Sequence, residues 1–223
     1  MSLERRSTSG LQFGVAYTLS RAKDDGSNLT DTLPDAYNPG SYWGISDLDR
    51  MHVLIANYIY ELPFLKGHER LRNRLLGNWE ISGVFQYQSG APFSVRTSDD
   101  VAGVGPGSGN QFYNLVGDAK LPHGAFEDPW FNKDAFVRPT AGTFGVQPRN
   151  SLRNPGFWST DFGVRKNFPV RDGQRLQLRM EVFNLLNHPS WNGASTNPTS
   201  GSFGLLTSKS GERQIQLSLS YAF

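Results

Sequence analysis

Apolar and polar residues alternate along several segments of the chain. The C-terminal segment is the clearest case, because Ile215, Leu217, Leu219, Tyr221 and Phe223 alternate with Gln, Ser and Ala. The segment from Leu11 to Leu19 alternates just as strictly. A period of two is typical of a β-strand whose two faces lie in different surroundings. The pattern therefore predicts a strand in each segment.

Four further segments show the same period. It is regular over 79–88 and 175–182, and less regular over 49–62 and 157–168, where Lys166 interrupts the apolar set. Strands of about ten to fourteen residues exceed the roughly five to six of an ordinary globular sheet. When tilted, such strands are long enough to cross the hydrocarbon core of a bilayer.

The second face of each predicted strand carries Gln, Ser, Arg and Glu, which suit water better than a packed sheet. The connections 21–48, 63–76, 97–156, 169–174 and 188–211 alternate between long and short. Transmembrane barrels have long extracellular loops and short periplasmic turns. We therefore predict an all-β fold, an antiparallel transmembrane β-barrel segment of about six long strands that ends at the periplasmic interface.

The composition excludes several classes of protein and of binding site. The 223 residues have a formal net charge of +2 and no cysteine, and the mean hydropathy is −0.46. These values argue against a helical membrane protein, and they exclude disulfides and thiolate metal sites. The net charge also shows no large excess of basic residues, which a nucleic-acid partner would favour.

Six strands are too few to close a membrane barrel, and open edges are costly in lipid. We therefore expect a fragment that begins at an internal methionine. Residues 1–10 are expected to be disordered or the start of a partial strand, and residues 11–223 to belong to the C-terminal part of a larger barrel.

An ordered series of motifs resembles the C-terminal barrel of TonB-dependent receptors, and in particular the Oar-like group with its carboxypeptidase-regulatory-like domain. The series runs through Asp49–His52, Tyr58–Phe64, Gly77–Gly83, Gln88–Phe93, Trp130–Phe131, Ala135–Phe136, Gly142–Gly145, Arg149–Gly156, Arg179–His188, Phe203–Gly204 and Arg213–Phe223.

The resemblance implies a barrel of twenty-two strands, of which this chain would supply the last six. It implies a place in the bacterial outer membrane and a role in the energy-coupled uptake or binding of a large or scarce solute, such as a carbohydrate or peptide. The implied partners are outer-membrane lipid, the remaining barrel strands and plug, and the barrel-assembly machinery. The energy-coupling complex would act only through the missing N-terminal part.

Two sets of residues are candidates for function. Ile215, Leu217, Leu219, Tyr221 and Phe223 form a strand that stops on an aromatic residue, which suggests an outer-membrane assembly signal. In the longest connection, Trp130, Phe131, Phe136 and Phe144 are candidate ligand contacts, although packing against the barrel rim is the favoured alternative.

No spacing of residues indicates catalysis, a metal or a cofactor, so we expect no enzyme and no cofactor. Asp24, Asp25, Asn28 and Asp31 lack the spacing of an EF-hand and read as a solvated turn. The alternatives are a soluble all-β carbohydrate-binding module and, less favoured, an all-β hydrolase.

Overall fold

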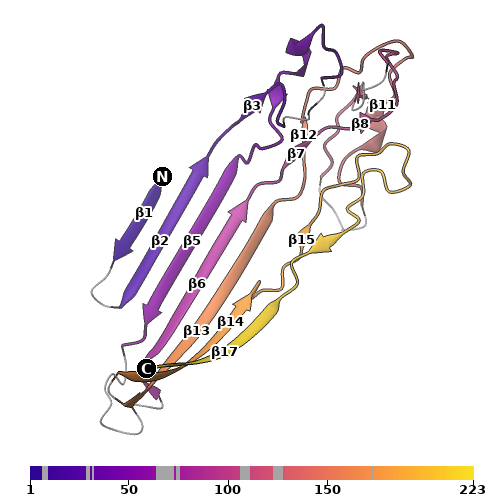
Figure 1. Ribbon diagram of the computed structural model, residues 1–223. Coiled ribbons are helices and arrows are strands. Elements are labelled where there is room, and N and C mark those ends of the chain that lie inside the picture. Colours follow the sequence, from indigo (N-terminus) through magenta and orange to yellow (C-terminus); the bar gives the residue numbers. More distant parts are fainter. Residues whose placement is uncertain are drawn as a thin grey trace.

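The computed structural model describes residues 1–6, 10–28, 31, 33–63, 73, 76–105, 111–122, 128–171 and 173–223. Its main element is a seven-stranded sheet in which every neighbouring pair is antiparallel (Figure 1). In spatial order the strands are β1 (Ser2–Arg6), β2 (Leu11–Leu19), β5 (His52–Glu61), β6 (Trp79–Gln88), β13 (Phe157–Arg171), β14 (Gln174–Phe183) and β17 (Gln214–Ala222).

The six predicted strands are all present, and the all-β antiparallel fold is confirmed. β1 is an addition, since the sequence left residues 1–10 between disorder and the start of a strand. It pairs with β2 from Ser2, opposite Ala16, to Arg6, opposite Gln12.

The pairing register places the predicted apolar positions on one face. Directly opposed residues share a face of a sheet. Leu217 lies opposite Met180, which lies opposite Val164. Val164 in turn lies opposite Ile81, and Ile81 opposite Tyr60. The apolar sets of the strands therefore merge into one apolar face. The residues between them form the other face, here called the polar face, which is mainly polar although Ile55, Ile59 and Val84 also lie on it.

Lys166 is a basic residue on the apolar face, as is Arg5 of β1, which lies opposite Phe13. The side chain of Lys166 is fully buried, and its Nζ donates a hydrogen bond to the carbonyl oxygen of Gly77. Nζ also lies 5.6 Å from the ring centroid of Trp79 and 4.9 Å from that of Phe168. The ammonium group at this end of β13 thus reaches back to a turn carbonyl and packs against aromatic rings, as long basic side chains do at an interface.

Long and short connections lie at opposite ends of the sheet. The connections 20–51, 89–156 and 184–213, here called the long loops, gather at one end, and the C-terminus lies at the other (Figure 1). The ends of β1, β5 and β13 and the starts of β2, β6 and β14 lie at the C-terminal end, where short stretches of sequence separate them. The predicted alternation of long and short connections is confirmed.

The hydrophobic core lies in the long loops and not against the sheet. Among the described residues, every buried hydrophobic residue except Val182 belongs to a long loop. Apolar residues of the sheet stay exposed instead, including Leu217 at 69% and Leu178 at 40%. A soluble sandwich buries one face of each sheet, so this sheet needs an apolar environment outside the chain.

Short elements build the long loops into a folded layer, here called the loop layer. Strand pairs join β3 (Lys23–Asp24) with β4 (Gly44–Ile45), β7 (Pro92–Phe93) with β12 (Leu152–Arg153), β8 (Arg96–Thr97) with β9 (Gln111–Phe112), β10 (Asn114–Leu115) with β11 (Phe136–Val137), and β15 (Ser190–Trp191) with β16 (Lys209–Ser210). Two 3-10 turns, η1 (Pro39–Tyr42) and η2 (Lys133–Ala135), complete it. In the part of the chain that is described, no helix has the length and apolar character needed to span a membrane.

Candidate functional site

An aromatic cluster at the centre of the loop layer joins two of the long loops. Phe131 is 1% exposed, and its ring centroid lies 5.6 Å from Phe93, 5.5 Å from Phe136 and 5.3 Å from Phe203. Phe203 comes from connection 184–213 and the other three rings from connection 89–156. The cluster therefore fixes these two loops to each other.

The four aromatic residues proposed as ligand contacts fall into two groups. Phe131 and Phe136 are buried in the core of the loop layer, where their rings serve packing. Trp130 is half-buried and packs against that core, and its Nε1 donates a 2.7 Å hydrogen bond to the carbonyl oxygen of Arg153. Phe144 is half-buried. Only Trp130 and Phe144 retain surface that a ligand can touch.

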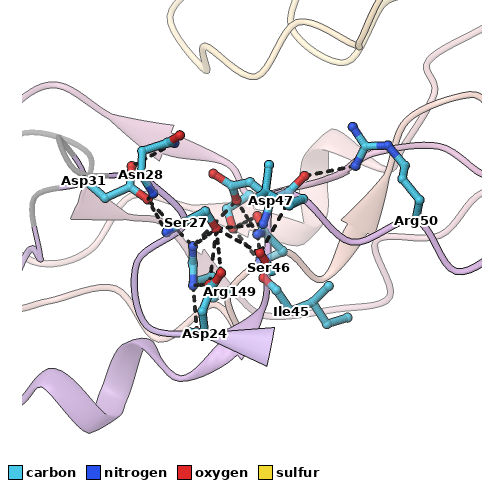
Figure 2. A network of polar contacts seen from close by, with 12 residues as sticks. Asp24, Ser27, Asn28, Asp31, Ile45, Ser46, Asp47, Arg50 and Arg149 are labelled. Carbon is cyan, nitrogen blue, oxygen red and sulfur yellow. Dashed lines mark hydrogen bonds and ion pairs between the residues drawn. The ribbon is translucent and has the colours of Figure 1, made fainter. Parts of the chain in front are cut away.

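A buried guanidinium, that of Arg149, joins connection 89–156 to connection 20–51 (Figure 2). Its side chain is 3% exposed and forms an ion pair with Asp24. The side chain also donates 2.7 Å hydrogen bonds to the carbonyl oxygen of Asp24 and to Oγ of Ser27. Further carboxylate oxygens lie 3.9 Å away at Asp31 and 3.8 Å away at Asp47. A fully buried cation would be costly alone, and these groups supply its charge partners.

The neighbouring residues extend this junction between the two loops. Asn150 has a left-handed backbone with φ of 55°, and its Nδ2 donates 2.7 Å to the carbonyl oxygen of Ile45. The backbone N–H of Asn150 donates 2.7 Å to Oγ of Ser94. Arg153 forms an ion pair with the fully buried carboxylate of Asp49. The segment from Arg149 to Arg153 is therefore a rigid clamp on connection 20–51.

The clamp lowers the pKa values of its carboxyl groups. Burial alone raises the pKa of Asp24, but hydrogen bonds from Ser46, Arg149 and Ser27 outweigh burial and hold the pKa below its ordinary value. Burial likewise raises the pKa of Asp49, and the hydrogen bond from Arg153 reverses the effect. Backbone hydrogen bonds from Ser27 and Asn28 outweigh the burial that raises the pKa of Asp31. These groups are charged at neutral pH.

The structure differs here from the solvated turn expected around Asp24 and Asp31. Both carboxylates face Arg149, and they are only 27% and 26% exposed. Among the described residues, no cluster of three His, Cys, Asp or Glu side chains could hold a metal ion. The acidic residues instead neutralise a cation of the chain itself. No local spacing of residues could predict this ion pair, because Arg149 lies 125 residues from Asp24.

A cavity of about 290 Å³ lies beside the clamp, between connections 20–51 and 89–156. Its apolar lining includes Ile45, Leu121 and Trp130, and its polar lining includes Lys120, Ser151 and Arg153. Small-molecule sites are usually concave and combine apolar surface with a few polar groups. The cavity is therefore the best candidate for ligand binding in the loop layer.

The polar face of the sheet carries a row of charges at the end opposite the loop layer. The register places Glu61 opposite Glu80, Glu80 opposite Arg165, and Arg165 opposite Arg179. Ion pairs join Glu80 with Arg165 and, along β14, Arg179 with Glu181. This face suits water, because charged side chains on an apolar boundary would be strongly destabilising.

The proposed assembly residues lie on the edge strand β17. Ile215, Leu217, Leu219 and Tyr221 share the apolar face with their partners on β14, and Phe223 follows the last paired residue. The ring of Phe223 lies 6.1 Å from that of Tyr221 and is 96% exposed. The outer edge of β17 pairs with no strand in the described part of the chain, so its backbone groups can pair with a further strand.

The chain was compared with known proteins. A family model described as an outer membrane beta barrel domain matches residues 1–216. The comparisons with curated proteins and with solved structures gave no match.

Proposed function

The chain belongs to the outer membrane beta barrel domain family, and we propose that it serves in the barrel of a TonB-dependent receptor of the Oar-like group. In this role it takes part in the energy-coupled uptake or binding of a large or scarce solute, such as a carbohydrate or peptide. The family places the chain in the bacterial outer membrane. The apolar face of the sheet then meets lipid and the polar face meets water.

The observation that carries the proposal is the loop layer. Barrel loops that only connect strands do not need a buried core, two 3-10 turns and five strand pairs of their own. A long connection with this much structure is usually functional. A receptor holds its ligand-binding loops in a fixed shape, and the aromatic cluster and the Arg149 clamp supply that rigidity.

Two further features support the finer assignment. The motifs that resemble the Oar-like group include Asp49 and the segment 149–156, which meet in the ion pair of Asp49 with Arg153. Both outer strands of the sheet, β1 and β17, have an edge that pairs with no other described strand. In lipid those edges need further barrel strands, as a larger receptor would supply.

Uptake measurements in a bacterium that carries the gene test the proposal. We expect loss of the protein to abolish uptake of one class of solute, and loss of TonB to abolish the same uptake. Because one pathway is affected, the double deletion should cause no further loss. Growth on single limiting solutes, compared among the parent, the two single deletions and the double deletion, measures this.

Complementation supplies the control. The Gln216→Arg variant, altered on the wet face, should restore uptake, whereas Leu217→Arg, altered on the lipid face, should not. Uptake that depends on this protein but survives the loss of TonB would identify a passive channel and contradict the proposal.

A further inference from the structure

The cavity in the loop layer has a preformed wall. Arg153 is held by its ion pair with Asp49 and by a 3.1 Å hydrogen bond to the carbonyl oxygen of Gly90. Asn150, which also lines the cavity, is 1% exposed and bonded to Ile45. Because these side chains are already held in place, ligand binding would cost little conformational entropy on this side of the cavity.

The ionisable side chains in the described lining of the cavity are all basic. Lys120 and Arg153 are its only ionisable side chains, and no Asp or Glu belongs to the described lining. The charge of Arg153 is balanced by Asp49. Lys120 is exposed and forms no ion pair with any described residue. Within the described part of the chain, the lining therefore carries one positive charge without an ion-pair partner, and it also includes the hydroxyl group of Ser151.

The remaining lining is apolar. Ile45, Leu121 and the half-buried Trp130 provide a surface for a ring or an alkyl group. A volume of about 290 Å³ is near the lower end of ligand sites, which run from roughly 300 to 1,000 Å³. This size suits a small molecule, or the end group of a larger one.

We propose that this cavity binds an organic carboxylate. The anionic group pairs with Lys120 and accepts a hydrogen bond from Ser151, while the apolar body lies along Ile45, Leu121 and Trp130. The inference deepens the proposed function by naming the chemistry of the solute, and it rests on that function only for the solute's arrival from outside the cell.

Titration of the intact barrel protein, purified in detergent micelles, with benzoate tests the proposal, with benzamide as an uncharged probe of the same shape. Calorimetry or ligand-observed NMR measures each dissociation constant. A charge-assisted hydrogen bond favours benzoate by about tenfold. We expect Lys120→Gln to abolish that preference. The Leu121→Trp variant, which fills the cavity, should weaken binding of both probes.

Lys209→Gln is the matched control. Lys209 is likewise an exposed cation of the loop layer, with its Nζ 6.0 Å from the ring centroid of Trp191. It does not line the cavity, so its variant should retain the preference for benzoate. Absent benzoate binding, equal binding of the two probes, or a preference that survives in Lys120→Gln would overturn the inference. Because these measurements need no membrane transport, their failure is separate from a failure of the uptake experiment.

Discussion

Arg149 shows how one side chain can order two loops. Its buried guanidinium meets three carboxylates of connection 20–51. Removing one partner of a buried ion pair leaves charges without compensation and typically costs about 3–5 kcal/mol. We expect Arg149→Met to lower the stability of the loop layer by about 3 kcal/mol. This value is at the low end of the range because the carboxylates are partly exposed. Faster amide hydrogen exchange across 33–51 and 89–105 measures this loss.

The pair of Arg138 with Asp99 is the matched control for this prediction. The two groups lie 2.8 Å apart but are about half exposed, at 53% and 50%. Exposed pairs contribute roughly 0–1 kcal/mol, so Arg138→Gln should leave hydrogen exchange nearly unchanged. Similar effects of the two variants would show that Arg149 has no special role in joining the loops.

Acidic pH should loosen the same junction. The pKa values of Asp24, Asp31 and Asp49 lie below the ordinary value of an aspartate side chain. The unfolded chain therefore binds more protons than the folded chain as the pH falls toward these values. The stabilisation is complete above about pH 5 and is lost as the pH falls through the folded pKa values.

Near-UV circular dichroism of the loop aromatics, recorded with denaturant between pH 7 and pH 2.5, tests this dependence. The unfolding midpoint should stay level from pH 7 to about pH 5 and then decline. The decline should be smaller in Arg149→Met, where part of the junction is already absent. A midpoint that rises on acidification would contradict the assigned pKa directions.

Each spanning strand divides its residues between lipid and water, which makes the effect of a new charge depend on the face. Leu217 lies on the apolar face opposite Met180, whereas Gln216 lies on the polar face opposite Glu181. Leu217→Arg should destabilise the barrel by about 2–4 kcal/mol, because Leu217 lies close to the middle of β17. Gln216→Arg should be nearly neutral, because Glu181 offers a charge partner.

Unfolding of the barrel in lipid vesicles, followed by tryptophan fluorescence, gives the two values. Leu178→Arg and Gln177→Arg repeat the comparison on β14, where they lie opposite Leu219 and Ser220. A register slip of one residue exchanges the two faces. Equal costs on both faces would therefore refute the assigned alternation.

The spanning strands could be predicted from sequence because a local pattern encodes them. The period of two located Leu11–Leu19 and Gln214–Ala222 almost to the residue. β1 was not resolved from disorder because Ser2–Arg6 holds only one large apolar residue, Leu3. The loop layer was missed for a different reason. Its contacts join residues such as Asn150 and Ile45, 105 positions apart, and no periodicity records such pairs.

At the scale of the whole molecule, the apolar sheet and the loop layer have opposite relations to water. The loop layer buries its own core, but the sheet exposes apolar side chains and two outer strands. Lipid provides the non-aqueous environment that the apolar face needs. The backbone N–H and C=O groups of the outer strands need hydrogen bonds, which in lipid only further strands can supply. Insertion therefore depends on how the free edge of β17 meets a partner strand during assembly.

The last prediction concerns that edge. Ile215, Leu217, Leu219, Tyr221 and Phe223 place an alternating apolar pattern beside unpaired backbone groups, which is the arrangement that strand addition recognises. If these residues form the assembly signal, deletion of Phe223 or Phe223→Asp in the intact protein should leave little inserted barrel and much degraded protein in the periplasm. Surface labelling and membrane fractionation of cells measure both pools.

Closure of the barrel by β17 is the competing explanation, and it predicts a different result. Phe223 lies beyond the last paired residue, Ala222, so pure closure needs little from its ring. The deletion would then give a normally inserted barrel with a slightly lower melting temperature. Ala222→Ser, on the polar face beside it, is the control and should insert normally under either explanation. Normal surface levels without Phe223 would exclude the assembly signal, because an assembly signal that includes Phe223 requires its recognition before insertion.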